Sequence, residues 1–420
     1  MSKEKMGLNE TWSMAVGGMV GGGIFSVLGV IIATAGNMAW LSFFIAGLIA
    51  LATGISYSNL TNKFEEGGGA FTYIKDINHQ GLAGGLSWLL IIGYILTLSV
   101  YAFTFGQYLE KLLNFGPWFP RLISISIILI FMYLNLRGVS DASQLEVFIV
   151  WAKLAILVGI ASLGLWQFDL QIFNSGHLKS AGTFANAIVG ASTIFMAYEG
   201  FQLITYDYED IKDADSTIRK AEILAVISVI FIYILVTLGT INLVSYQTII
   251  EEKEVVLAIA GENILGTAGL IIASIAALFS TGSAINSTLF ATSRLAIKVA
   301  NDGELPSFLA HKNKSGLPDR SIYVIGGTGA LLAAFGNLAS LVEAASFIFL
   351  VTFSVVNFIA FKEIKENKTV SFLGGLGASI SSILLFIRFL NRDLKIIIAL
   401  AVLLFLATIG RNLIYRIKSQ

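Results

Sequence analysis

The sequence predicts an all-α polytopic membrane protein, because its composition and its long apolar runs both fit that class. Of its 420 residues, 56% are hydrophobic and only 13% are charged, and the mean hydropathy is +0.80. Soluble domains carry about 25% charged residues, so this chain could not cover a water-exposed surface. The apolar runs suit helices that cross a bilayer in about 20 residues and are too long for barrel strands of about ten.

About 12 such spans follow one another along the chain. The candidate spans are residues 11–34, 39–61, 83–112, 120–136, 145–165, 183–206, 221–245, 267–300, 321–336, 338–360, 370–389 and 393–415. The first follows a short polar head and has no small-residue cleavage site, so we do not interpret it as a removable signal peptide. We expect one transmembrane domain over residues 1–415, with a head at 1–10.

The Lys and Arg residues predict the orientation of these spans. Most of the 27 lie in loops on the side that holds both termini. Because cytoplasmic loops carry an excess of Lys and Arg, we expect a multi-pass protein of the cell membrane with both termini in the cytoplasm. The formal net charge of zero gives no reason to expect a nucleic-acid partner.

Several classes of function lose support from what the sequence lacks. The chain has no cysteine and only three scattered histidines, so it has no thiolate nucleophile and no His-rich metal cluster. No nucleotide-binding GxxxxGKS/T motif occurs, and the loops are too short for a soluble catalytic domain. We therefore expect neither an enzyme nor an ATP-driven pump, and no cofactor.

The first span carries a run of helix-breaking residues at its midpoint, Gly21-Gly22-Gly23. Each interior glycine costs about 1 kcal/mol of helix stability relative to alanine, so three in a row predict an unwound turn. Backbone groups freed in a membrane must line a polar cavity. Close helix packing is the alternative interpretation, and Gly17-x-x-x-Gly21 has the spacing that it needs.

A second break is predicted in the sixth span, where Glu199 and Gly200 interrupt an apolar run. Breaks five spans apart are typical of inverted-repeat secondary transporters. We therefore expect a LeuT-like fold with broken helices 1 and 6. Its parts would be a first five-helix repeat at 11–165, a second, inverted repeat at 183–360 and two extra helices at 370–415.

Five stretches, in order, carry a resemblance to a known family. Gly21–Phe25 is similar to a G-S/A-G-I-F motif, Glu66–Tyr73 to a glycine-rich loop after helix two, and Tyr198–Phe201 to a sixth-helix break. Glu209–Ala221 is similar to the cytoplasmic segment that follows, and Ser293–Pro306 to an eighth-helix exit. Together they resemble the amino acid–polyamine–organocation transporter superfamily. The middle motif residue is glycine here instead of Ser, Ala or Thr, and two usual prolines are missing.

The resemblance implies a pocket for a small amino acid or amine between the two breaks and the third helix. The residues that it implies in substrate binding are Val20, Gly21, Gly22, Gly23, Ile24, Tyr94, Phe195, Ala197, Tyr198, Glu199 and Gly200. Half-helix N-termini would present free N–H groups to a substrate carboxylate.

Lys153 lies near the middle of the fifth span. It is about eight residues, or roughly 12 Å, from either interface, which is too far for its side chain to reach water. Ionisable groups at such depth mark ion or proton paths. In members of the superfamily a fifth-helix lysine replaces a bound sodium ion, and the resemblance implies that Lys153 bridges the first-helix break and helix eight near Ser280 and Ser283. A proton would then be the coupling ion, and sodium would not be required; a fixed structural cation is the competing interpretation.

Glu199 falls where the family commonly has an apolar residue. Its carboxylate could pair with a cationic substrate, carry a proton, partner Lys153 or cap free N–H groups at a helix end. We predict a secondary amino acid transporter that works by alternating access, proton-coupled and sodium-independent, as a monomer or homodimer. An exchanger without proton coupling and a substrate-binding sensor remain the alternatives.

Overall fold

The protein is described here from a computed structural model. It describes residues 5–65, 67, 69–76, 80–138, 143–166 and 183–392. In these residues the structure is helical, and β-structure is limited to a single bridge between Met6 and Ile211. The predicted all-α class is confirmed.

The first half of the described chain forms six α-helices. They are α1 (Leu8–Ala35), α2 (Ala39–Phe64), α3 (Gly69–Asp76), α4 (Gln80–Leu113), α5 (Phe119–Leu136) and α6 (Ser143–Trp166), with a 3₁₀ turn, η1 (Gly36–Met38), between the first two. The second half begins with α8 (Phe184–Thr193), η2 (Phe195–Tyr198) and η3 (Phe201–Asp210). It continues with α9 (Ala214–Leu243), α10 (Tyr246–Glu251), α11 (Val256–Leu265), α12 (Thr267–Asn301), η4 (Ser307–Ala310), α13 (Asp319–Phe335), α14 (Leu338–Glu363) and α15 (Lys368–Arg392).

These helices match the predicted spans closely. Among the described residues, eight apolar helical stretches could cross a membrane, with α1 and α2 counted as one, and a bent pair makes a ninth. The predicted span 321–336 appears as α13, which is 17 residues long. The predicted span 393–415 lies outside the described residues.

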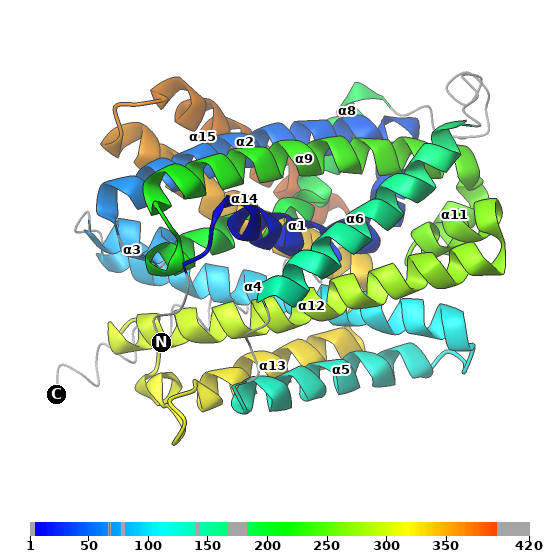
Figure 1. The fold of residues 1–420 in the computed structure, drawn as a ribbon. Coiled ribbons are helices and arrows are strands. Elements are labelled where there is room, and N and C mark those ends of the chain that lie inside the picture. The colour runs from blue at the N-terminus through cyan, green and yellow to red at the C-terminus, as the bar shows by residue number, and fades with distance from the viewer. Residues whose placement is uncertain are drawn as a thin grey trace.

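Helix α1 lies at the centre of the bundle, in contact with α6, α9 and α12 (Figure 1). Helix α2 packs against α9, and α14 packs against α15 and α4. Large apolar side chains such as Phe148 and Phe231 remain exposed on the outer helices, which suits a surface that faces lipid.

The predicted break in the first span is wrong for this conformation, because α1 is one continuous α-helix from Leu8 to Ala35. Its glycines are instead sites of very close packing. A Cβ on Gly22 would overlap the ring of Tyr101, and a Cβ on Gly21 would lie 2.8 Å from that of Ala284. Contacts of this kind offset the low helix propensity of glycine, so close packing, the alternative interpretation, explains the run here.

The predicted break in the sixth span is confirmed. Helix α8 and the segment Phe195–Asp210 form one apolar pair that bends by 61°. Glu199 has extended backbone angles and Gly200 has φ +127°, a region that favours glycine. A Cβ on Gly200 would also collide with the backbone of Gly18 in α1. This position therefore requires glycine for two reasons, its positive φ and the close approach of α1.

Ser346 of α14 satisfies backbone groups that the break leaves open. Its Oγ accepts a hydrogen bond from the Met196 N–H (3.0 Å) and donates to the Thr193 carbonyl (2.8 Å). On the other side of the break, the Gly200 N–H donates to Oε1 of Gln202 (3.0 Å). A break inside a membrane bundle is tolerated because such partners exist.

Candidate substrate and coupling site

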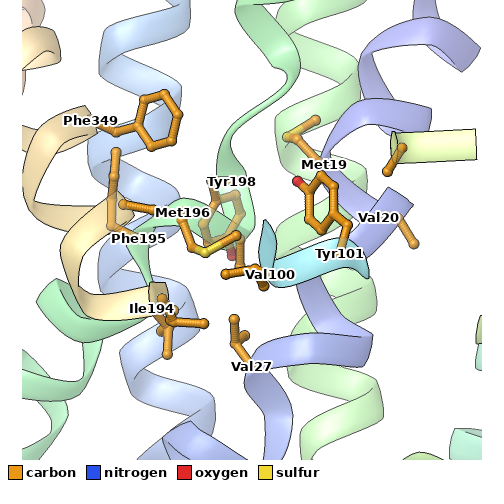
Figure 2. Close-up of a cluster of buried hydrophobic side chains, with 14 of the residues drawn as sticks. Met19, Val20, Val27, Val100, Tyr101, Ile194, Phe195, Met196, Tyr198 and Phe349 are labelled. Carbon is orange, nitrogen blue, oxygen red and sulfur yellow. The ribbon is translucent and has the colours of Figure 1, made fainter. Parts of the chain in front are cut away.

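The centre of the bundle is where α1, α4, α14 and the sixth-span break meet. Figure 2 shows side chains of α1 (Met19, Val20, Val27), α4 (Val100, Tyr101), the break (Ile194, Phe195, Met196, Tyr198) and α14 (Phe349) gathered there. All are buried, so in this conformation the centre is filled by the protein's own side chains.

Glu199 lies in a network of neutral hydrogen-bond donors beside this cluster. Its Oε1 accepts from Nε2 of Gln202 (3.1 Å) and its Oε2 accepts from the hydroxyl of Tyr101 (3.4 Å). Gln202 also donates to the Tyr94 hydroxyl (3.1 Å), which lies 3.2 Å from that of Tyr206. The network thus links the predicted Glu199 and Tyr94.

Three carbonyls in the middle of α1 each receive a side-chain donor from another helix. Nζ of Lys153 donates to the Gly17 carbonyl (3.2 Å), and Oγ of Ser280 donates to that of Val20 (2.9 Å). The Tyr233 hydroxyl lies 2.8 Å from the carbonyls of both Met19 and Ala197, and so links α1 to the break.

The same carbonyls also pair within α1. In an α-helix each carbonyl accepts from the N–H four residues later. The carbonyls of Gly17, Met19 and Val20 are therefore partners of the N–H groups of Gly21, Gly23 and Ile24. If this turn unwinds, the carbonyls of Gly17 and Val20 keep their side-chain donors, and that of Met19 shares the single Tyr233 hydrogen with the Ala197 carbonyl. The N–H groups become free.

Of the other predicted side chains, those of Tyr198 and Phe195 contact neighbouring helices and not the Glu199 network. The Tyr198 hydroxyl donates to the Phe43 carbonyl of α2 (2.8 Å), and its ring packs against Tyr233. Phe195 packs edge-on against Phe353 of α14, and Ser283 is half-buried in α12, near Ser280 in sequence.

Sequence reasoning missed three residues of this centre: Tyr101, Gln202 and Tyr233. Tyr101 could have been found, because it lies two helical turns after Tyr94 and so on the same face of α4. Gln202 is a polar residue three positions after Glu199. Nothing in the sequence distinguishes Tyr233 from other tyrosines of an apolar helix.

Polar contacts join α12 to α3 and the residues before it on the side of the molecule that holds the N-terminus. Lys298 of α12 donates to the Gly67 carbonyl (2.6 Å) and to Oγ1 of Thr72 (2.9 Å). Lys75 of α3 forms an ion pair with Asp302 (2.6 Å). We refer to these four side chains and the Gly67 carbonyl as the α3–α12 contact.

Comparison with known proteins decides the family. The amino acid permease model matches residues 7–416, nearly the whole chain. The chain belongs to the amino acid permease family. This permease is therefore a multi-pass membrane transporter of amino acids and not an enzyme.

Relatives of the permease occur in archaea, bacteria and mammals. It is 30% identical to the uncharacterized protein MJ0609 of Methanocaldococcus jannaschii, over 90% of this chain and 88% of that one. It is 29% identical to the inner membrane transport protein YbaT of Escherichia coli, over 85% and 83% of the two chains. Identity to the human large neutral amino acids transporter small subunit 2 is 28%, over 73% of this chain and 60% of the human protein.

Proposed function

We propose that this permease is a proton-coupled, sodium-independent amino acid transporter that works by alternating access, with both termini in the cytoplasm. The observation that carries the proposal is the set of donors on α1 from Lys153, Tyr233 and Ser280. With these donors, three of the four carbonyls of one α1 turn would keep a hydrogen-bond partner if the turn unwound, which lowers a cost that is high in a membrane.

The unwound turn would bind the substrate carboxylate. The N–H groups of Gly21, Gly23 and Ile24 would then be free to donate to it, and Gly22 would have lost its contact with Tyr101. Backbone N–H groups at a half-helix end suit an anionic group. In this proposal the continuous α1 is a state without substrate.

Lys153 would couple this change to protons. Its contact with the Gly17 carbonyl favours the ammonium form, whereas a buried lysine without such an acceptor favours the neutral amine. Movement of α1 relative to α6 would therefore bind or release a proton, and the ammonium would occupy the position that a sodium ion would otherwise need.

Uptake into proteoliposomes tests the coupling. We expect a pH gradient to drive uptake without sodium, and Lys153→Ala to remove the pH dependence or stop net transport. Lys111→Ala is the matched control, since Lys111 forms a surface ion pair with Glu252 (3.7 Å). Strict sodium dependence, or an unchanged pH profile in Lys153→Ala, would refute the proposal. Binding without exchange of labelled substrate would identify a sensor.

Two substrate classes have support. Glu199 is buried with only neutral donors among the described residues, and a cationic substrate side chain would neutralise it. The apolar side chains gathered at the centre of the bundle, such as Phe195 and Phe349, and the name of the human relative favour neutral amino acids. Thermal shift with lysine, arginine, alanine and leucine separates the classes, because a ligand stabilises the state that binds it. Selective loss of the basic ligands in Glu199→Gln supports the first class, and stabilisation of the native protein by neutral ligands alone supports the second.

A further inference from the structure

Another buried acid, Glu222, lies in α9. Glu222 is fully buried, and neither oxygen of its carboxyl group has a hydrogen-bond partner among the described residues. It is eight positions after Ala214, the first residue of α9, so it lies about 12 Å along the helix. Glu222 is the second residue of the predicted span 221–245, so the helices packed around it, and not depth in the membrane, account for its burial.

The surroundings of Glu222 contain no cation that could neutralise it, within the part of the chain that the structure describes. It faces Gly54 of α2, where an added Cβ would make ordinary contact with Glu222 (3.9 Å) and with the ring of Phe201 of η3 (3.7 Å). Its ionisable neighbours are Tyr57 and Tyr73, and Tyr206 of η3 lies near those two. The cations of α9 and of the elements packed on it have other partners or are exposed: Lys63 pairs with Glu363, Lys153 donates to the Gly17 carbonyl, Arg219 pairs with Glu366 (3.6 Å) and Lys220 is exposed. The acids of the packed elements whose side chains are described are Glu10, which accepts from the Gly7 N–H, the exposed Glu262, and Asp207, Glu209 and Asp210 of η3.

An ionised carboxylate in such a place costs several kcal/mol unless a cation or hydrogen-bond donors compensate it. A protonated carboxyl group avoids most of that cost. We propose that Glu222 is a second proton-binding site, which holds a proton in this conformation and releases it when η3 moves away and water reaches the carboxyl group.

A path for that proton begins on the side that holds the N-terminus. Two buried polar atoms of α2 have no hydrogen-bond partner among the described residues: the hydroxyl of Tyr57, a neighbour of Glu222, and Oδ1 of Asn62, near the end of the helix. Asn62 also lines an open cleft together with Arg219 and other residues of α9. Unpartnered buried polar atoms of this kind commonly bind water, which conducts protons.

The release step moves only a proton. The O–H bond of the Glu222 carboxyl group breaks, and water in the cleft accepts the proton. The inference rests on the proposed function in one respect, since it places this step within the proton-coupled cycle.

Infrared difference spectroscopy tests the protonation state directly. We expect the native protein at neutral pH to show the carbonyl stretch of a protonated carboxyl group, and Glu222→Gln to lose that band. Glu343→Gln is the matched control, because buried Glu343 is paired with Arg388 (2.9 Å) and should contribute no such band. An unchanged spectrum in Glu222→Gln would mean that Glu222 is ionised and would overturn the proposal.

Reversal potentials in proteoliposomes test the role in transport. Glu222→Gln should keep exchange of labelled substrate within about twofold, while the number of protons moved per amino acid falls by one. An unchanged proton number overturns the second site, and if Lys153→Ala loses coupling in the same assay, the proposed function still stands. Transport by the native protein without any proton movement overturns both.

Discussion

At the centre of the molecule the ring of Tyr101 fills the space that a Gly22 side chain would need, and this contact can be tested by double substitution. Gly22→Ala should destabilise the protein by about 1–3 kcal/mol, because the new Cβ must displace a packed ring. In a Tyr101→Ala background the same change should cost nothing, since the ring is gone. Thermal unfolding in detergent measures both.

Gly159→Ala is the control for helix propensity. It lies within α6, and a Cβ there would meet nothing within 4 Å. It should be neutral or stabilising by up to about 1 kcal/mol. Equal effects of the two alanines would mean that the Tyr101 contact has no energetic role.

Ser346 is a second residue whose effect can be predicted. Ser346→Ala leaves the Met196 N–H and the Thr193 carbonyl without their side-chain partner. Each unsatisfied buried group costs about 1–3 kcal/mol, so the loss should be about 2–6 kcal/mol. Thr352→Val in the same helix is the control, because Thr352 bonds only its own helix, to the Ile348 carbonyl (2.9 Å). A similar melting temperature for both variants would contradict this role.

Among individual residues, the sequence identified those whose type is unusual for the apolar segments around them. Lys153 and Glu199 are charges in apolar runs, and Gly200 follows a charge, so each could be recognised without a structure. Tyr101 and Tyr233 could not, because their importance depends on which helix faces them. For Gly21–Gly23 the sequence predicted a break that the structure does not have, because the sequence alone cannot show that neighbouring side chains fill the space beside these glycines.

At the scale of the element, the bend of the sixth span depends on Gly200. Gly200→Ala should cost more than about 3 kcal/mol or prevent folding, because it adds backbone strain to a collision with Gly18. Gly316→Ala is a matched control, with φ +78° but open space around it, and should cost only about 1 kcal/mol. Yield and thermal stability after purification compare them. Equal losses would show that strain alone, and not contact with α1, determines the effect.

The long elements were predictable, and the short ones were not. Continuous apolar character identified the spans through α15, since a membrane requires it over a whole helix. Helices α3, α10 and α11 were missed because they are 8, 6 and 10 residues long and give no span-length signal. The division into two inverted repeats stays a prediction.

At the scale of the whole molecule, the α3–α12 contact should control access from the side that holds the N-terminus. The chain has no cysteine, so a single introduced thiol can report on this opening. Thr205→Cys replaces a fully buried residue of η3 and should react slowly with a water-soluble thiol reagent. Adding Lys298→Met removes the donor to Gly67 and Thr72, and should raise the labelling rate about tenfold or more.

An exposed thiol provides the comparison for this experiment. Ser315→Cys lies in an exposed loop and should label at the same rate with or without Lys298→Met. If Thr205→Cys is labelled rapidly even with Lys298 intact, the α3–α12 contact does not close the molecule.

In this conformation the ring of Tyr101 packs against Gly22, at the turn proposed to bind the substrate, and so competes with the substrate for that position. A substrate must first displace that ring, so its apparent dissociation constant is the intrinsic value divided by the fraction of molecules already open. An open fraction of about 1% would weaken the measured affinity about 100-fold. Weak binding to the purified permease would then reflect this built-in occupant and not a poor fit to the substrate. The same ring, on returning to Gly22, would help to expel substrate on the other side of the membrane.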